Sequence, residues 1–304
     1  MDARQKTAIV TGASQGIGAG IVKGFVERGD PEAALAVAAV TATGAIDTSY
    51  VEHAYIEPEA GFARMDGDTL VISACTQAPQ MDRDDTALVL GLPVGKVRIL
   101  PTATGGGFGS KGGLKVEPIA VALAFHTNGR PVRVKFNREE TFISTLTRHE
   151  AVVYSKSGVK KDGTLMAREM TIYWGAGAYA EKSPTVCIRG SLPAPGPYRI
   201  PHVKVDGYAV YTNKPVAGSY RGYGIPQGAW AGEQQMDEIA KRLGMDPVDI
   251  RMKNIFVEGD ISYWGEQLHA VGLKETLVKA TEAIDWGKKP SNVRPGVKIG
   301  KGFA

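Results

Sequence analysis

Two glycine-rich segments decide the fold expected for this chain: Gly105-Gly106-Gly107-Phe108-Gly109-Ser110-Lys111 and Ala217-Gly218-Ser219-Tyr220-Arg221-Gly222-Tyr223-Gly224-Ile225-Pro226-Gln227. Glycine allows a backbone to approach a ligand closely and to adopt positive φ without steric cost. Each segment also carries aromatic or cationic side chains. We therefore expect the two segments to converge as a main-chain cradle for one bulky group.

The composition narrows the class of protein. The 304 residues are 43% hydrophobic and 22% charged, which is typical of globular domains. The net charge of +4 is mild, and no basic run is interleaved with aromatic residues, so nucleic acid is not an expected partner. The two cysteines, Cys75 and Cys187, exclude a disulfide framework and an iron–sulfur cluster held by this chain alone. No apolar run approaches the ~20 residues that cross a bilayer, and the first residues do not form a signal peptide. A cytoplasmic protein without membrane contact is expected.

The pattern of elements indicates an α+β fold, because strands and helices mix without regular alternation. Strands are expected at residues 62–65, 70–74, 97–100, 132–136, 151–155, 166–174 and 200–211, with hairpin turns at 66–68 and 161–163. Helices are expected at 81–90, 116–126 and 226–243, and from residue 247. The helix at 226–243 is the clearest, since Pro226 suits a first helical position and Gly244 a C-terminal cap.

The first 29 residues have a pattern of their own. Residues 7–10 suggest a strand, Thr11 to Gly18 a glycine turn and residues 19–28 a helix, an arrangement that aims a helix N-terminus at an anion. This resembles the opening of the short-chain dehydrogenases, in which Gly12, Gly16 and Gly18 would bind a nucleotide. The Tyr-x-x-x-Lys pair of that family does not occur. We therefore expect an isolated Rossmann-like β-α stub at 1–29 without a working NAD(P) site. A connecting helix and linker are expected at 30–50, with a break at residues 43–44.

A second resemblance covers residues 51–260. The matching stretches, in order, are His53-Ala54-Tyr55-Ile56-Glu57-Pro58-Glu59, Ser73-Ala74-Cys75-Thr76-Gln77, residues 105–111, Thr147-Arg148-His149, residues 220–227 and Arg251-Met252-Lys253-Asn254. Together they resemble the molybdopterin-binding subunit of the xanthine dehydrogenase and aldehyde oxidase family. The resemblance implies the first half of a mixed-sheet molybdopterin-binding domain, with residues 261–304 leading to an absent second half.

The chemistry implied by this resemblance is oxidative hydroxylation of an aldehyde or an N-heterocycle at molybdenum. The metal is held by the pterin, so no metal-ligating side chain is expected in this chain. The resemblance also implies an iron–sulfur subunit and an FAD subunit as partners that accept the electrons. Whether the pterin carries a cytosine nucleotide is left open.

Site residues are carried over by position. Gln77 would donate from its amide to a molybdenum oxo group, and Phe108 and Gly109 would present backbone N–H groups there, with Gly107 allowing close approach. Arg221 would stabilise negative charge beside the metal. Arg148, Tyr220 and Tyr223 would contact the substrate. The competing interpretations are a backbone-satisfying glutamine, a structural salt bridge for Arg221, core packing for the tyrosines and a solvated Arg148.

Two differences between this sequence and the family limit what can be expected of its substrate and its activity. Gly112 stands where purine-oxidising members carry a glutamate, so purine specificity is not expected. The general-base glutamate belongs to the absent second half, so no catalytic residue is assigned and the chain should be inactive alone. Two alternatives stay open: a fragment of an NAD(P)-dependent short-chain dehydrogenase, and a non-catalytic remnant or assembly scaffold.

Overall fold

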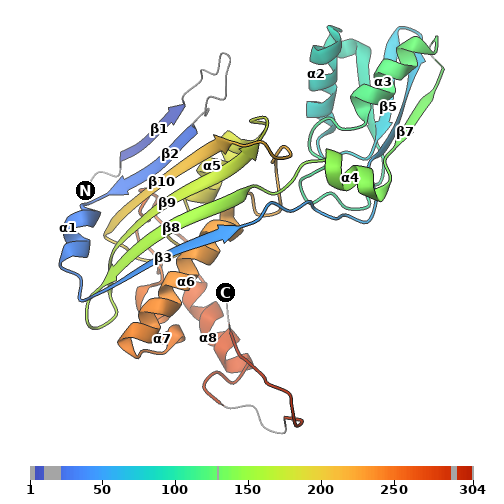
Figure 1. Ribbon diagram of the computed structural model, residues 1–304. Helices are drawn as coiled ribbons and strands as arrows, with labels where there is room; N and C mark the ends of the chain where they lie inside the picture. The colour runs from blue at the N-terminus through green and yellow to red at the C-terminus, as the bar shows by residue number, and fades with distance from the viewer. Residues whose placement is uncertain (1–3, 10–21, 129, 289–292, 303–304) are drawn as a thin grey trace.

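The computed structural model describes residues 4–9, 22–128, 130–288 and 293–302. Its strands are β1 (Arg4–Ile9), β2 (Val22–Arg28), β3 (Val40–Thr48), β4 (Ala60–Asp66), β5 (Thr69–Ala74), β6 (Val97–Pro101), β7 (Val132–Lys135), β8 (Glu150–Val159), β9 (Leu165–Gly177) and β10 (His202–Tyr211). Its helices are α1 (Pro31–Ala36), α2 (Pro79–Leu90), α3 (Glu117–His126), α4 (Arg138–Ser144), α5 (Ser183–Ser191), α6 (Ile225–Leu243), α7 (Pro247–Asn254) and α8 (Leu273–Ala283), with a 3-10 turn at Val94–Lys96. Figure 1 shows two lobes, each built on its own sheet.

The large lobe is built on a six-stranded mixed sheet. The strand order is β1-β2-β10-β9-β8-β3; β10 and β9 run parallel, and the other neighbours run antiparallel. Alternate residues point to opposite faces of a strand, so Val153, Ile172 and Val205 are buried while Tyr154 and Tyr173 are exposed. Helices α5 and α6 cover the buried face. This confirms the expected α+β class with mixed sheets.

The small lobe is a four-stranded sheet, ordered β6-β5-β4-β7, with α2 and α3 packed on it. Its separate core includes Leu70 and Ile72 from β5 and Ala120 and Val121 from α3, all at most 1% exposed. Figure 1 shows this lobe at one end of the large sheet. The two lobes therefore meet at a junction crossed by the segments that follow β3 and α4.

Local sequence signals explain several element ends. Asp30 caps α1 by accepting from the Ala33 N–H at 3.0 Å. Gly91 and Gly244 end α2 and α6 in the left-handed conformation. Met236, Ile239 and Ala240 lie on the buried face of α6. No helix among the described residues is both long and apolar enough to cross a bilayer.

The N-terminal expectation is wrong where the structure describes it. Residues 22–28, expected in a helix, form β2, which pairs antiparallel with both β1 and β10. The segment therefore belongs to the large sheet and is not an isolated unit. Val26 is buried in the large core, and pairing with a strand on each side satisfies the backbone groups that a helix would have satisfied internally.

A second expectation fails directly after α1. The connecting helix expected within residues 30–50 is α1, which stops at Ala36, and the break expected at residues 43–44 is instead the middle of β3. β-branched residues favour strands, and β3 pairs with β8 along its whole length. The helices α4, α5 and α8 were not anticipated. The domain boundaries drawn at residues 29, 50 and 260 stay predictions.

Candidate functional site

The two glycine-rich loops, residues 105–111 and 217–227, meet at the junction of the lobes. The first follows β6 of the small lobe, and the second leads from β10 of the large lobe into α6. At Gly109 an added Cβ would lie 2.5 Å from the carbonyl oxygen of Ser219 and 2.8 Å from its carbonyl carbon. Gly109 also has a φ of 113°, which other residues rarely adopt. The expected convergence of the loops is confirmed, and it depends on glycine at this position.

The segment at residues 53–57 fastens both loops. The His53 Nε2 atom lies 2.7 Å from the carbonyl oxygen of Ser219 in the second loop. The Glu57 carboxylate accepts from the Gly105 N–H at 2.8 Å and from the Lys111 ammonium at 2.6 Å, both in the first loop. One short segment therefore sets the separation of the two loops.

Lys111 anchors the first loop from inside the protein. Its side chain is fully buried, pairs with Glu57 and lies over the Tyr55 ring at 4.7 Å from the ring centre. Burial acts to raise the pKa of Glu57, but the hydrogen bonds from Lys111 and the Gly105 N–H outweigh it and hold that pKa below its usual value. The Glu57 carboxylate is therefore ionised at neutral pH.

Gln77 lies against the first loop. Its backbone N–H donates to the Lys111 carbonyl at 2.7 Å, and its Oε1 accepts from the Gly109 N–H at 3.0 Å. A Cβ on Gly107 would clash with the same Oε1 atom. The Gly109 N–H is thus engaged by Gln77, contrary to the expectation that it faces a ligand. The exposed amide NH₂ of Gln77 has no protein partner within the described part of the chain.

A buried carboxyl group supports the turn that carries Gln77. Asp82 is fully buried, and one of its oxygens accepts a hydrogen bond from the Thr76 hydroxyl. That hydroxyl in turn accepts from the Ala78 N–H at 2.9 Å. Burial raises the pKa of Asp82 to about 6, although the Thr76 bond opposes the shift. Asp82 therefore fixes the backbone on both sides of Gln77.

Two aromatic residues of the loops have strained backbones. Phe108 has a φ of 49° and Tyr223 a φ of 54°, a region in which a bulky residue costs about 1–3 kcal/mol and which is enriched at functional sites. The Phe108 side chain is 49% exposed. Tyr223 packs against the core of the large lobe, so core packing accounts for part of its role.

The second loop also presents Arg221 and Tyr220. Arg221 is exposed and forms no ion pair with any described residue, so the structure offers no support for a structural salt bridge. Tyr220 packs on His53 with ring centres 4.4 Å apart, and the Arg148 guanidinium lies 5.6 Å from the Tyr220 ring centre. Arg148 also donates to the Ser49 carbonyl at 3.0 Å. Arg148 therefore braces Tyr220 instead of projecting into solvent.

His149 ties the Thr147-Arg148-His149 motif to the large lobe. It is 1% exposed, and its Nε2 lies 2.7 Å from the Ser183 hydroxyl of α5. Burial lowers the pKa of His149 to about 4, although a hydrogen bond with the Gly218 backbone opposes the shift. The imidazole is therefore neutral at physiological pH.

This burial predicts a pH-dependent stability. The pKa of His149 is lower in the folded state than the ordinary value of about 6.5, so the stabilisation is complete above pH 6.5 and is lost as the pH falls towards 4. His149→Gln keeps a hydrogen-bonding side chain but removes the titrating group. We therefore expect its unfolding free energy to fall by about 1–3 kcal/mol less than that of the unchanged protein between pH 7 and 4. Urea unfolding of both proteins between pH 7 and 4 measures it; parallel curves would contradict the prediction.

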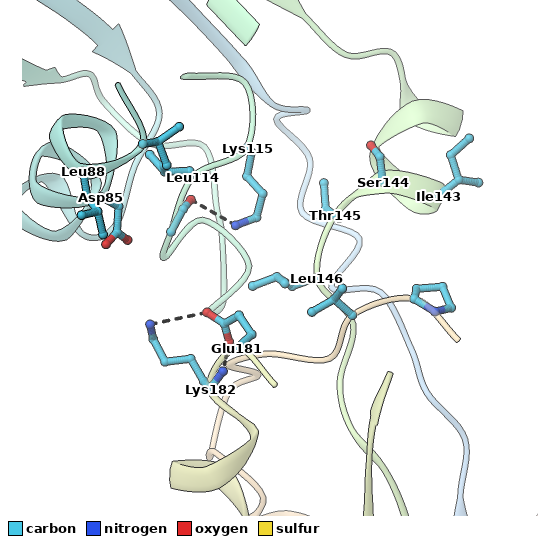
Figure 2. Close-up of a pocket in the computed structure, with 14 residues that line it drawn as sticks. Asp85, Leu88, Leu114, Lys115, Ile143, Ser144, Thr145, Leu146, Glu181 and Lys182 are labelled. Atoms are coloured by element: carbon cyan, nitrogen blue, oxygen red, sulfur yellow. Dashed lines mark hydrogen bonds and ion pairs between the residues drawn. The ribbon is translucent and has the colours of Figure 1, made fainter. Parts of the chain in front are cut away.

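A cavity of about 550 Å³ adjoins the meeting point of the loops. Figure 2 shows Lys115, Glu181 and Lys182 reaching into it between α2 and the end of α4. The chain that follows the first loop and the chain that precedes the second both line it. The lining residues are Asp85, Leu88, Val89, Gly113, Leu114, Lys115, Ile143, Ser144, Thr145, Leu146, Glu181, Lys182, Pro215 and Val216.

Comparison with known proteins places this geometry in a family. A family model described as the molybdopterin cofactor-binding domain matches residues 18–255. The chain belongs to this family. The match begins upstream of residue 51 and includes β2, in agreement with the pairing of β2 in the large sheet.

The matches to curated relatives cover most of this chain, but the relatives themselves are longer proteins. It is 40% identical over 259 residues to the nicotinate dehydrogenase large molybdopterin subunit of Eubacterium barkeri, a match covering 84% of this chain and 61% of the relative. It is 34% identical over 265 residues to the xanthine dehydrogenase molybdenum-binding subunit of Escherichia coli O157:H7, covering 84% of this chain and 35% of that one. The chain thus spans about a third to three fifths of the length of these relatives.

A solved structure has the same architecture. The aldehyde oxidoreductase from Desulfovibrio gigas superposes with a TM-score of 0.83 at 29% identity, over 86% of this chain and 29% of that one. The molybdopterin-binding domain therefore has a fold like that of a known oxidoreductase. The short-chain dehydrogenase resemblance is not supported by these relatives, and its glycines, Gly12, Gly16 and Gly18, lie outside the described residues.

Sequence reasoning missed the residues that hold the loops together. The sequence gives no site role to His53, Glu57, Lys111, Lys115 or Asp82 beyond the matching stretches in which some of them stand. The available signal was that a histidine and a glutamate stand four residues apart in a stretch that matches the family. Only the structure shows that one reaches each loop.

Proposed function

We propose that this chain forms part of the large subunit of a molybdenum hydroxylase, which oxidatively hydroxylates an aldehyde or an N-heterocycle. The observation that carries the proposal is the contact of Gly109 with Ser219, which joins the two loops in a chain of the molybdopterin cofactor-binding family. Relatives named for nicotinate, xanthine and aldehyde oxidation support the reaction class.

The residues present fit a bound molybdenum–pterin group. Gln77 offers an exposed amide NH₂, Arg221 an exposed unpaired guanidinium, and the glycines at 107 and 109 leave no side chain in the way. No cluster of three or more His, Cys, Asp or Glu side chains in the described ranges is placed to hold a metal ion, and a pterin-held metal needs none. When bound, the group, in its plain or cytosine-dinucleotide form, supplies the two-electron oxidation and oxygen transfer.

The protein would position the cofactor and the substrate and would stabilise the charge that develops on the substrate. Gln77 would donate a neutral hydrogen bond to the group, and the backbone N–H of Phe108 would add a second donor. The fixed charge of Arg221 would stabilise negative charge that develops on the substrate. Tyr220, held by His53 and Arg148, and Tyr223 would form an aromatic wall for a planar substrate. No residue of this chain is assigned as the general base.

The partners follow from the same proposal. Electrons removed from the substrate must leave the site, and an iron–sulfur subunit and an FAD subunit would carry them away. The nicotinate and xanthine dehydrogenase relatives are themselves named as subunits. The proposed location is the cytoplasm.

Gln77 provides the direct test of cofactor binding. We expect Gln77→Ala to lower the molybdenum and pterin retained on purification by about tenfold, because a lost hydrogen bond beside a metal weakens affinity by about 10–100-fold. Metal analysis and pterin fluorescence after expression in a host that makes the cofactor measure the loss.

The matched control is Gln80→Ala, three residues along and exposed on α2. It should retain the cofactor of the unchanged chain. Absence of molybdenum and pterin from the unchanged chain, under conditions that load a known relative, would overturn the proposed function.

A further inference from the structure

The cavity beside the loops contains two lysines in different electrostatic situations. The Lys182 ammonium lies 3.4 Å from Glu181 Oε1 and 3.2 Å from the Met81 sulfur. The Lys115 ammonium donates to the Gly113 carbonyl at 3.0 Å, and no carboxylate of the described residues lies within salt-bridge distance of it. Lys115 therefore keeps two donor hydrogens and a positive charge at the wall of the cavity.

The acidic groups around Lys115 leave this charge facing the cavity. Burial lowers the pKa of Lys115, and the through-space effects of Glu59, Glu117, Glu181 and Asp82 oppose that shift. Glu59, Asp82 and Glu117 are each at most 3% exposed, and none of the three lines the cavity. Glu181 does line it, yet one of its oxygens faces the Lys182 ammonium and the other accepts the Lys182 backbone N–H. Asp85 borders the cavity from α2 (Figure 2).

The rest of the lining is largely apolar. Leucine, isoleucine, valine and proline side chains from α2, the end of α4 and the two loop approaches supply it, and the cavity of about 550 Å³ is of the size that holds small organic ligands. An ammonium at the wall of a largely apolar cavity can form a charge-assisted hydrogen bond with a carboxylate, while the apolar lining contacts the hydrophobic or aromatic body that carries it.

We propose that this cavity binds a small aromatic or heteroaromatic carboxylic acid, with the Lys115 ammonium as the counter-ion of the carboxylate. As a statement about substrate class, the inference rests on the proposed function: the hydroxylated ring would carry an acid group. Binding itself requires neither molybdenum nor turnover, so it can be measured separately.

The test compares acids with their neutral amides on the unchanged full chain without cofactor. Pyridine-3-carboxylate and benzoate, against pyridine-3-carboxamide and benzamide, are titrated by calorimetry and by ligand-observed NMR. We expect each acid to bind at least about tenfold more tightly than its amide, since hydrogen bonds to charged groups contribute about 1.5–3 kcal/mol. Equal binding of acid and amide would overturn the inference.

Three variants test whether the preference for the acid depends on Lys115. Lys115→Met should abolish it and Lys115→Arg should keep most of it, whereas Lys182→Met should change acid affinity by less than about fivefold because that lysine is already paired. A preference that survives in Lys115→Met, or is lost in Lys182→Met alone, would contradict the assignment. Thermal melting of each variant confirms that the comparison is made on folded protein.

Failure of this inference is distinguishable from failure of the proposed function. Equal binding of acid and amide to a chain that retains molybdenum and pterin overturns only the acid site. A clear acid preference in a chain that never retains the cofactor overturns only the hydroxylase assignment and leaves an acid-binding cavity in place.

Discussion

Gly109→Ala is expected to separate the two loops and to abolish retention of the cofactor. The new methyl group would lie 2.5 Å from the Ser219 carbonyl oxygen, closer than any van der Waals contact allows. That carbonyl cannot simply move away, because the His53 ring is hydrogen-bonded to it. The φ of 113° at Gly109 adds strain of its own. The backbone of the second loop, and not a flexible side chain, must therefore shift.

The expected loss of unfolding free energy is about 3–5 kcal/mol. Strain at such a φ accounts for about 1–3 kcal/mol, and overpacking against fixed atoms adds a similar amount. Denaturant unfolding measures the stability, and molybdenum analysis after expression with the cofactor measures retention. Both quantities should fall together, because one contact holds the cradle in shape.

Gly112→Ala, directly after the first loop, is the matched control. Gly112 lacks a positive φ, and the nearest atom to an added Cβ is the Gly109 carbonyl oxygen at 3.5 Å, an ordinary contact. Gly→Ala at a compatible position changes stability by less than about 1 kcal/mol and often in the favourable direction. Equal stability of the two variants would show that the loops do not depend on their contact.

The elements with local signals could be predicted from the sequence, and those set by distant pairing could not. Gly244 after a helical stripe ends α6 where expected, and the Asp66-Gly67-Asp68 turn joins β4 to β5. Residues 22–28 have apolar spacing compatible with either a helix or a strand. Their strand conformation depends on β10, which lies more than 170 residues further along the chain. No local pattern contains that partner.

The same distinction applies to the site. Convergence of the loops could be inferred from glycine density, because glycine serves where backbones approach closely. The hydrogen bond from the Gly109 N–H to Gln77 could not be inferred, because it depends on where the Lys111 carbonyl and the turn at Thr76 hold the Gln77 backbone. Lys115 differs from Lys182 only in its neighbours, so composition alone could not separate them.

Glu57→Ala is the other change expected to have a large effect, because it leaves a charge buried without its partner. The Lys111 side chain is fully buried, and the Glu57 carboxylate is the acceptor at 2.6 Å. Removing one partner of a buried ion pair costs about 3–5 kcal/mol; since Glu57 itself is 35% exposed, we expect a loss of about 2–4 kcal/mol. The Gly105 N–H also loses its acceptor, so cofactor retention should fall as well. Denaturant unfolding gives the first quantity and metal content the second.

The double variant separates the buried charge from the lost contact. In Glu57→Ala with Lys111→Met no charge is left unpaired, and an apolar replacement of a buried pair is often close to neutral, so much of the stability should return. Cofactor retention should not return, because the Gly105 N–H still lacks the carboxylate.

Glu275→Ala is the matched control at the surface. Glu275 pairs with Lys279 at 2.5 Å, but both side chains are about 70% exposed. Such exposed pairs contribute at most about 1 kcal/mol. If Glu57→Ala were no more destabilising than Glu275→Ala, the Glu57–Lys111 pair would not be what holds the first loop in position.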